Sequence, residues 1–228
     1  IEGLKTGDVP VEVKRYLAGK VFNLTSAYDA AVSRFMLGSE NPEENELQHY
    51  YTMPLEKSQE LRYGENAHQK AALYLTADHK GAFGGMEQFQ GKELSYNNIR
   101  DLDVAWKAVS AYNKFVKNAE SVKSDDGSTV NFAGTEGSIF TIALKHNTPC
   151  GAALGKDALD SYKKTYECDP VSIFGGIIGC SGTIDKAAAE EMVKCFLEVI
   201  VAPDFTEEAL EVFKAKKNLR IIKATVEA

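Results

Sequence analysis

The sequence predicts an α/β fold, because strands and helices are expected to alternate along its second half. From residue 139 onward, short apolar runs rich in β-branched residues alternate with segments of helical length. Glycine, proline and helix-capping residues separate these segments. Such alternation is typical of a parallel or mixed sheet covered by helices. We expect this sheet to follow a short helical segment at the amino-terminal end.

The first part of the chain is expected to be helical. Pro10 suits the start of a helix over residues 11–16, since its missing N–H would have no partner there. Thr25 and Ser26 are suitable caps for a second helix over residues 27–37. The polar, acidic run that follows, residues 38–45, predicts an exposed connection between domains.

Two strands and a long helix are expected in the middle of the chain. The strands fall at residues 50–54 and 71–75, on either side of a polar loop. After Asn98, apolar residues recur at helical spacing, which predicts a helix packed against the core. Its apolar face consists of Leu102, Ala105, Trp106 and Val109.

The second half begins with a strand over residues 139–144, and Pro149-Cys150-Gly151 shortly after it predicts a turn. Later strands are expected over residues 173–180, 199–201 and 220–224. Helices are expected over residues 157–166, 186–196 and 206–216, with Asp185 and Thr206 capping the last two.

The composition is that of an ordinary globular protein and argues against several classes. The 228 residues are 44% hydrophobic and 26% charged, with a net charge of −7 that disfavours binding to nucleic acid or anionic membranes. No apolar run is long enough to span a membrane, and the polar opening does not resemble a signal peptide. The four cysteines show no C-x-x-C spacing, which argues against zinc and favours a reduced, cytoplasmic protein. Because the chain starts with Ile1 and stops just after a strand-like run, we expect it to be part of a longer polypeptide.

Lys145 and His146 are the first candidate functional residues. They follow the apolar strand directly, at its carboxyl end, where ligands bind in open α/β sheets. A cation beside an imidazole suits proton transfer or the stabilisation of developing negative charge. The alternative is a strand that simply emerges into water at a lysine.

Two polar segments before that strand are further candidates. The loop that contains Arg62, Tyr63 and His68 holds groups that recognise phosphate or carboxylate, although a solvated turn is the alternative. Asn97 lies in a polar run just before the predicted helix, where simple helix capping is the alternative explanation.

Later in the chain, Gly175 and Gly176 would let the backbone approach a planar ligand, or would serve close packing. Glu198 could form a structural salt bridge or accept a hydrogen bond from a substrate amine. His49 and His79 lie in polar surroundings, and we assign them no role.

Four motifs occur together in one order: residues 62–69 (RYGENAHQ), 94–98 (LSYNN), 145–151 (KHNTPCG) and 169–176 (DPVSIFGG). In this set the chain resembles the bifunctional purine-biosynthesis family that joins AICAR transformylase to IMP cyclohydrolase. The resemblance covers essentially the whole chain. It implies that residues 1–38 are the end of a cyclohydrolase domain with linker helices. Residues 39–228 would be the first half of the transformylase domain.

The resemblance implies a cytidine-deaminase-like, three-layer α/β/α fold for that half. A zinc deaminase needs H-x-E and P-C-x-x-C. Here His146 is followed by Asn147-Thr148, and Cys150 is followed by Gly-Ala-Ala. The expected chemistry is therefore formyl transfer without a metal.

In the implied reaction, the 5-amino group of AICAR attacks the formyl carbon of the cosubstrate 10-formyltetrahydrofolate. His146 resembles the base, and Lys145 resembles the group that stabilises the oxyanion or protonates the leaving nitrogen. By the same resemblance, the following residues would hold the nucleotide and its base: Arg62, Tyr63, Gly64, His68, Asn97, Thr148, Phe174, Gly175 and Glu198. A homodimer is implied, whereas ring closure to IMP is not expected from these residues alone.

Two other hypotheses remain open from the sequence. One is a hydrolytic base deaminase without recognisable ligands, which stoichiometric zinc in the purified protein would support. The other is a non-catalytic module that binds purine nucleotide or supports a dimer. For such a module, His146→Ala would leave the parent enzyme's activity unchanged.

Overall fold

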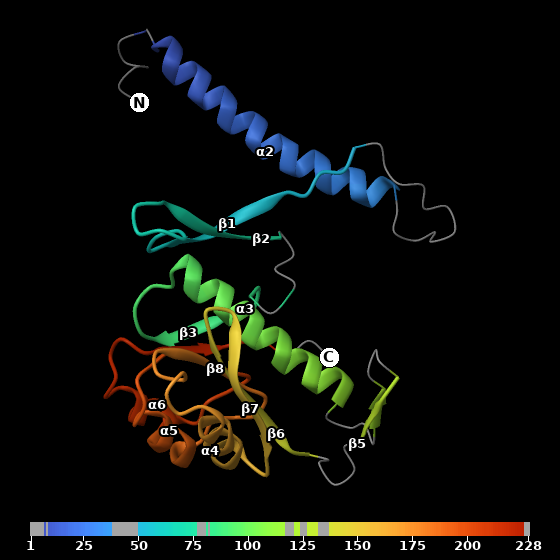
Figure 1. Cartoon of the computed structure of the whole chain (residues 1–228). Coiled ribbons are helices and arrows are strands. Elements are labelled where there is room, and N and C mark those ends of the chain that lie inside the picture. Colours follow the sequence, from blue (N-terminus) through green and yellow to red (C-terminus); the bar gives the residue numbers. More distant parts are fainter. Residues whose placement is uncertain are drawn as a thin grey trace. The chain divides into compact units, whose positions relative to one another are not determined.

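The computed structural model describes residues 7, 9–37, 50–76, 81, 83–116, 121–123, 127–131 and 137–225. The chain divides into two compact units, residues 1–57 with 74–78 and residues 58–73 with 79–228. Figure 1 labels their helices and strands. The predicted connection at residues 38–45, with the domain boundary at 38/39, lies outside the described residues, as do His49 and His79.

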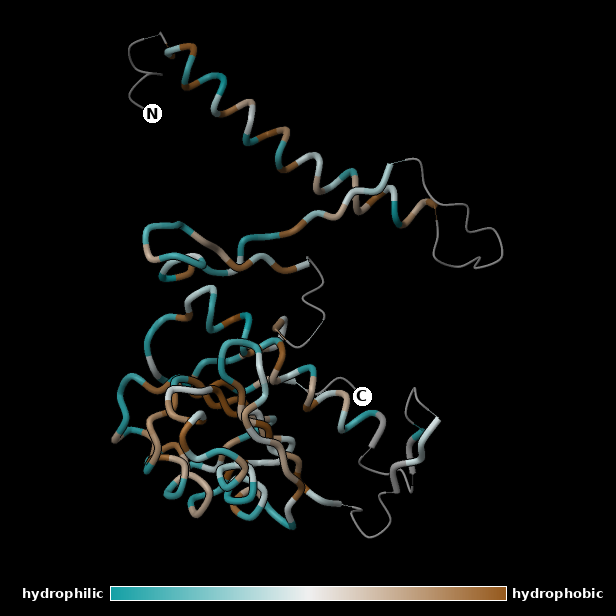
Figure 2. The backbone as a smooth tube through the Cα atoms, viewed as in Figure 1, coloured by the Kyte–Doolittle hydropathy of each residue, from teal (hydrophilic) through white to brown (hydrophobic). Residues whose placement is uncertain are grey.

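The first unit contains one long helix, α2 (Val11–Leu37), where the sequence predicted two shorter ones. The Thr25 and Ser26 hydroxyls donate to the carbonyls of Phe22 (3.3 Å) and Asn23 (2.9 Å), so they do not cap a new helix. Hydroxyls satisfied in this way allow the helix to continue. Among the residues of α2, all of which are described, only Ala30 is buried. Figure 2 shows apolar and polar residues interspersed along its whole length.

Strands β1 (Leu55–Leu61) and β2 (Ala71–Thr76) form a two-stranded sheet. The prediction for β2 is confirmed, whereas the strand predicted over residues 50–54 is wrong, because β1 begins only at Leu55. Pro54 has no N–H to contribute to a strand ladder, which explains why regular pairing starts after it. A second small sheet pairs β4 (Ser121–Lys123) with β5 (Thr129–Asn131).

A mixed six-stranded sheet forms the centre of the second unit, which confirms the predicted α/β class. Its spatial order is β3 (Glu87–Gln90), β10 (Arg220–Lys223), β9 (Leu197–Ala202), β8 (Gly176–Cys180), β6 (Ile139–Lys145) and β7 (Thr148–Gly155). Strands β8, β9 and β10 are parallel. Strand β6 runs antiparallel to both of its neighbours, and β3 runs antiparallel to β10.

Helices cover both faces of this sheet (Figure 1). On one face, α3 (Tyr96–Ala111) buries Leu102, Ala105, Trp106 and Val109, as predicted, and a π-helical turn over Tyr112–Val116 continues it. The other face carries α4 (Ala158–Cys168), α5 (Lys186–Met192) and α6 (Glu207–Phe213) over a second apolar cluster. The predicted caps are confirmed, because the Asp185 and Thr206 side chains accept hydrogen bonds from the N–H groups of Ala188 and Ala209.

The turn after β6 lies earlier than predicted. His146 and Asn147 are its two central residues, and Pro149-Cys150-Gly151 belongs to β7. Both turn residues have positive φ angles, 53° and 60°, the pattern of the type I′ turns that connect hairpin strands. Pro149 is tolerated because β7 is an edge strand with irregular register between Ala143 and Leu144.

Candidate functional site

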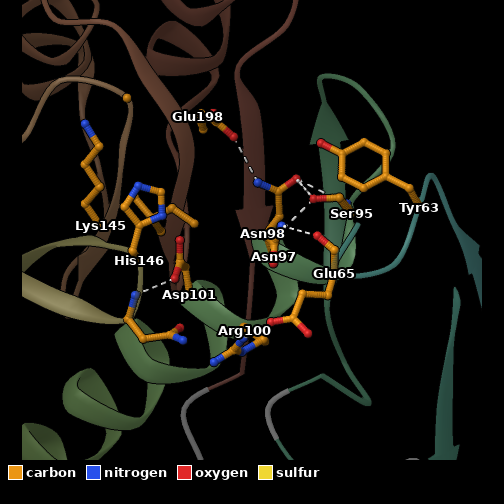
Figure 3. A pocket seen from close by; sticks show the side chains of 13 residues that line it. Tyr63, Glu65, Ser95, Asn97, Asn98, Arg100, Asp101, Lys145, His146 and Glu198 are labelled. Carbon is orange, nitrogen blue, oxygen red and sulfur yellow. Dashed lines mark hydrogen bonds and ion pairs between the residues drawn. The ribbon is translucent and has the colours of Figure 1, made fainter. Parts of the chain in front are cut away.

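A pocket of about 480 Å³ opens where β6 ends and where α3, β8 and β9 begin. Figure 3 shows polar side chains from these elements converging on it. The lining residues are Tyr63, Glu65, Ser95, Asn97, Asn98, Arg100, Asp101, Lys145, His146, Asn147, Gly175, Ile177 and Glu198.

The strand directions correct one step of the sequence argument. Because β6 is antiparallel to β8, with Leu144 opposite Ile177, its carboxyl end lies at the amino-terminal ends of the parallel strands. The pocket therefore lies at the amino-terminal ends of the parallel strands, whereas open parallel sheets bind ligands at the carboxyl ends. Lys145 and His146 belong to a pocket, but for a different topological reason than the sequence suggested.

Lys145 and His146 lie next to each other at the pocket (Figure 3). Lys145 is the last residue of β6, and its Nζ donates to the Phe174 carbonyl at 2.9 Å. This bond holds the ammonium beside the turn that leads into β8. His146 is exposed, so its ring is accessible to a ligand in the pocket. A held cation and an accessible imidazole together can transfer protons and stabilise an anion.

A hydrogen-bonded chain forms another wall of the pocket. Asn98 Nδ2 donates to Glu198 Oε2 at 3.0 Å, while Asn98 Oδ1 accepts from the Ser95 backbone N–H and hydroxyl. Ser95 is the N-cap of α3, so the same contacts cap the helix and orient the amide. The Glu198 side chain remains 44% exposed, which leaves it able to accept further hydrogen bonds from a ligand.

Arg220 supports Glu198 from behind. Its guanidinium lies 3.9 Å from Glu198 Oε2 and donates to the carbonyls of Lys92 and Glu93. Burial lowers the pKa of Arg220, and the negative charge of Glu198 acts in the opposite direction. Of the two alternatives for Glu198, the salt bridge is thus present, and the carboxylate also faces the pocket.

The loop after β1 is tied to the start of α3. The N–H of Arg62 donates to the Leu94 carbonyl, and the N–H of Tyr96 donates to the Tyr63 carbonyl, both at 3.1 Å. On the pocket side, Asn97 Nδ2 donates to the Glu65 carbonyl at 3.3 Å. These bonds place Tyr63 and Asn97 at the pocket.

The structure brings six of the predicted site residues to the pocket. They are Tyr63, Asn97, Lys145, His146, Gly175 and Glu198. The other five, which do not line it, are Arg62, Gly64, His68, Thr148 and Phe174.

Two of these five have visible structural roles. Gly64 closes its loop by donating to the Gln69 carbonyl, and a Cβ at Gly64 would lie 2.9 Å from Gln69 Cβ. The Phe174 carbonyl accepts a hydrogen bond from Lys145, and its ring packs against that of Phe196 with 5.2 Å between the ring centroids. The two glycines differ in role. Gly175 lines the pocket, whereas Gly176 permits close packing, because a Cβ there would lie only 2.8 Å from the Leu144 carbonyl oxygen.

Seven lining residues were not among the predicted site residues: Glu65, Ser95, Asn98, Arg100, Asp101, Asn147 and Ile177. Four of them, Glu65, Ser95, Asn98 and Asn147, lie within the motifs that carry the family resemblance. The S-x-x-N capping pattern was the available signal for Ser95 and Asn98. For Asp101 there was no local signal, because its partner Asn147 lies 46 residues away.

The described residues contain no metal-binding cluster and no membrane-spanning helix. No group of three or more histidine, cysteine, aspartate or glutamate side chains is placed to hold a metal ion in this part of the chain. None of the helices described is both long and apolar enough to cross a membrane.

Comparison with known proteins identifies a family. The model of the "AICARFT/IMPCHase bienzyme" family matches residues 1–228. The bifunctional purine biosynthesis protein PurH of Clostridium acetobutylicum is 53% identical over 220 residues, which are 96% of this chain and 38% of that protein. PurH of Brachyspira hyodysenteriae is 50% identical over 220 residues, covering 96% of this chain and 39% of that protein. The chain thus spans about two fifths of the length of these relatives.

Among solved structures, RibD of Acinetobacter baumannii matches 54% of this chain and 35% of its own, with 10% identity and a TM-score of 0.37. A likeness this low carries no argument about fold or function.

Proposed function

Because this chain belongs to the AICARFT/IMPCHase bienzyme family, we propose that it supplies the first half of the AICAR transformylase domain in a longer enzyme of purine biosynthesis. In this proposal residues 39–228 form that half, and residues 1–38 end a preceding cyclohydrolase domain. The share of the PurH relatives that the chain covers, 38% and 39%, supports a partial enzyme. IMP cyclohydrolase activity would then depend on residues outside these 228.

The proposed reaction moves a formyl group from 10-formyltetrahydrofolate to the 5-amino group of AICAR. The amine nitrogen bonds to the formyl carbon, the bond from that carbon to the folate nitrogen breaks, and formyl-AICAR results. The amine is a weak nucleophile because its lone pair is delocalised, so a base must take its proton as the bond forms. The folate nitrogen must gain a proton as it leaves.

The observation that carries this proposal is the convergence of Lys145, His146 and Glu198 on one pocket. His146 is the proposed base, and the Lys145 ammonium stabilises the oxyanion or protonates the leaving nitrogen. Glu198, held by Asn98, would accept a hydrogen bond from the substrate amine.

The remaining predicted residues are proposed to hold the nucleotide. Tyr63, Asn97 and Gly175 line the pocket and would contact it directly. For Arg62, Gly64, His68, Thr148 and Phe174 the proposal rests on the family motifs, since they do not line the pocket as described. Contact with AICAR would require the ligand to extend beyond the described lining, to the Gly64 backbone and to the side chains of the other four.

The finer fold assignment, a cytidine-deaminase-like domain, also belongs to this proposal. An antiparallel hairpin, β6–β7, followed by the parallel strands β8, β9 and β10 with helices between them, supports it. Several expectations stay predictions. They are the homodimer, the cytoplasmic location, and the absence of a metal requirement, of nucleic-acid partners and of membrane partners.

The first test is calorimetric titration of AICAR into this chain. We expect weak, saturable binding, which Arg62→Ala weakens by about tenfold because a charge-assisted contact is lost. His146→Ala should change the affinity little, because a base acts mainly in the transition state. Lys163→Ala, an exposed change on α4, is the control.

Formyl transfer is then measured in the complete enzyme. Loss of the base in His146→Ala should lower kcat by about 100-fold or more. The 228-residue chain alone should turn over slowly or not at all. Absence of AICAR binding, even after addition of the rest of the domain in trans, would contradict the proposal.

A further inference from the structure

The turn that carries His146 has an unusual composition. In a two-residue hairpin with positive φ at both central positions, Asn-Gly is the favoured sequence, because glycine adopts positive φ without strain. Here the turn is His146-Asn147, with φ angles of 53° and 60°. Any residue other than glycine adopts the left-handed region at a cost in free energy, so contacts outside the turn help to hold His146 and Asn147 there.

Those contacts come from the second turn of α3. The Asn147 backbone N–H donates to Asp101 Oδ1 at 2.7 Å. With its amide nitrogen facing α3, the Asn147 side chain donates to the same Oδ1 at 2.8 Å and its oxygen accepts from Arg100 Nη2 at 2.8 Å. Asp101 thus receives the backbone hydrogen bond drawn in Figure 3 and, with the amide in this orientation, a second bond to the same oxygen from the side chain of the same turn residue.

The helix that supplies the carboxylate is itself rigidly held. The capping box of Ser95 and Asn98 fixes its start, and the buried Leu102 and Trp106 fix its inner face. Asp101 lies between these two anchors and is half-buried. Asp101 is therefore suited to fix the hairpin turn relative to α3.

We infer that Asp101 is a positioning residue, which keeps the β6–β7 turn in its left-handed conformation and so holds the His146 imidazole in the pocket. This role rests on the proposed function, in which His146 is the base. Asp101 acts through Asn147, the residue after His146. Its carboxylate accepts a hydrogen bond from the Asn147 backbone and none from the imidazole.

The kinetic test uses the complete enzyme with Asp101→Ala. Misplacing a catalytic group by about 1 Å costs on the order of 100-fold, so kcat should fall by about that factor, while KM for AICAR changes by less than about threefold. Asp101→Asn retains an acceptor oxygen, and its kcat should fall by less than about tenfold. The control is Asp103→Asn, which removes only an exposed ion pair with Lys107 on the same helix and should leave kcat unchanged.

A second-site change separates positioning from direct chemistry. Glycine at position 147 favours the turn without any external contact, so Asn147→Gly combined with Asp101→Ala should recover at least about tenfold of the lost kcat. A carboxylate that exchanged protons with His146 or substrate could not be replaced in this way. Failure of the double variant to recover, with the single variant inactive, would overturn the positioning role.

A readout independent of activity completes the test. The Asn147 amide proton should exchange slowly with solvent in the wild-type chain and at least about tenfold faster in Asp101→Ala, as measured by nuclear magnetic resonance. Equal exchange in both proteins would overturn the inference. If the wild-type enzyme transfers no formyl group, the proposed function fails, and the exchange measurement still decides whether Asp101 holds the turn.

Discussion

A single buried guanidinium, that of Arg220, joins three parts of the second unit. Its side chain is only 7% exposed and reaches the carbonyls of Lys92 and Glu93, ahead of α3, as well as Glu198 at the pocket. Removing this guanidinium would leave the Lys92 and Glu93 carbonyls without their donor and would take the counter-charge from the partly exposed Glu198. Stability and the position of Glu198 therefore depend on the same residue.

We predict that Arg220→Met lowers the free energy of unfolding by about 3 kcal/mol, mainly because the Lys92 and Glu93 carbonyls lose a charged hydrogen-bond donor. Urea denaturation measures the change. The control is Lys223→Met, which removes an exposed ion pair with Asp204 and should cost less than about 1 kcal/mol. Equal losses in the two variants would contradict the role assigned to Arg220.

At the scale of residues, the sequence alone predicted a functional residue where a reactive side chain directly follows a recognisable strand. Lys145 and His146 stood out because two ionisable groups end an apolar strand. Asp101 and Asn98 could not be found in this way, because their partners, Asn147 and Glu198, lie 46 and 100 residues away. Only the folded arrangement of α3, β6 and β9 brings them together.

At the scale of elements, α4 illustrates a helix start with two acidic groups. Asp157 caps the helix, and Asp160 in its first turn accepts from Lys164 Nζ (2.8 Å) and from the Lys156 backbone N–H (3.0 Å). The hydrogen bond from Lys164, followed by the one from Lys156, lowers the pKa of Asp160 below its usual value. The ionised form thus favours the folded state.

The sign of the pH dependence follows from this lowered pKa. Stability from Asp160 is fully present above the unfolded-state pKa of about 3.9, and it disappears as the pH falls through the lower folded-state pKa. Wild type should therefore have a higher urea midpoint than Asp160→Asn at about pH 6, and the difference should shrink below about pH 3. Glu167→Gln, at the exposed end of the same helix, controls for loss of a surface charge. A difference independent of pH would refute the assignment.

Most helices of the second unit were predictable because their caps are local. Asp185 and Thr206 each accept from an N–H three residues ahead, so sequence and structure agree there. The predictions that were wrong concern the ends of helices and strands, whose positions depend on the rest of the fold. Thr25 and Ser26 resemble caps but bond within a continuing helix, and Pro149 resembles a turn residue but lies in an edge strand.

At the scale of the whole molecule, the two units have very different cores. Among its described residues, α2 buries only Ala30, whereas the second unit has two apolar clusters on opposite faces of its sheet. The only tryptophan of the chain, Trp106, is 2% exposed in the second unit, and its indole N–H donates to the Thr225 carbonyl. Tryptophan fluorescence therefore reports on that unit alone.

We predict that the two units lose structure in separate transitions. On addition of urea, far-UV circular dichroism should lose the signal of α2 before the fluorescence of Trp106 changes, because helices with little buried surface are marginally stable in water. The variant Trp106→Phe should keep the first dichroism step, which confirms that it arises elsewhere. Coincident transitions by both probes would show that the chain unfolds as one cooperative unit.

The pocket is built from contacts that are distant in sequence, and this affects when it can form during synthesis. Lys145 and His146 leave the ribosome well before Glu198. Arg220, which contacts both Glu198 and the Glu93 carbonyl 127 residues before it, comes later still. The β6–β7 hairpin can close early because its contacts are local. The nascent chain cannot complete the pocket until β10 has emerged, so truncated products ending before β10 would not compete with finished chains for a ligand of this site.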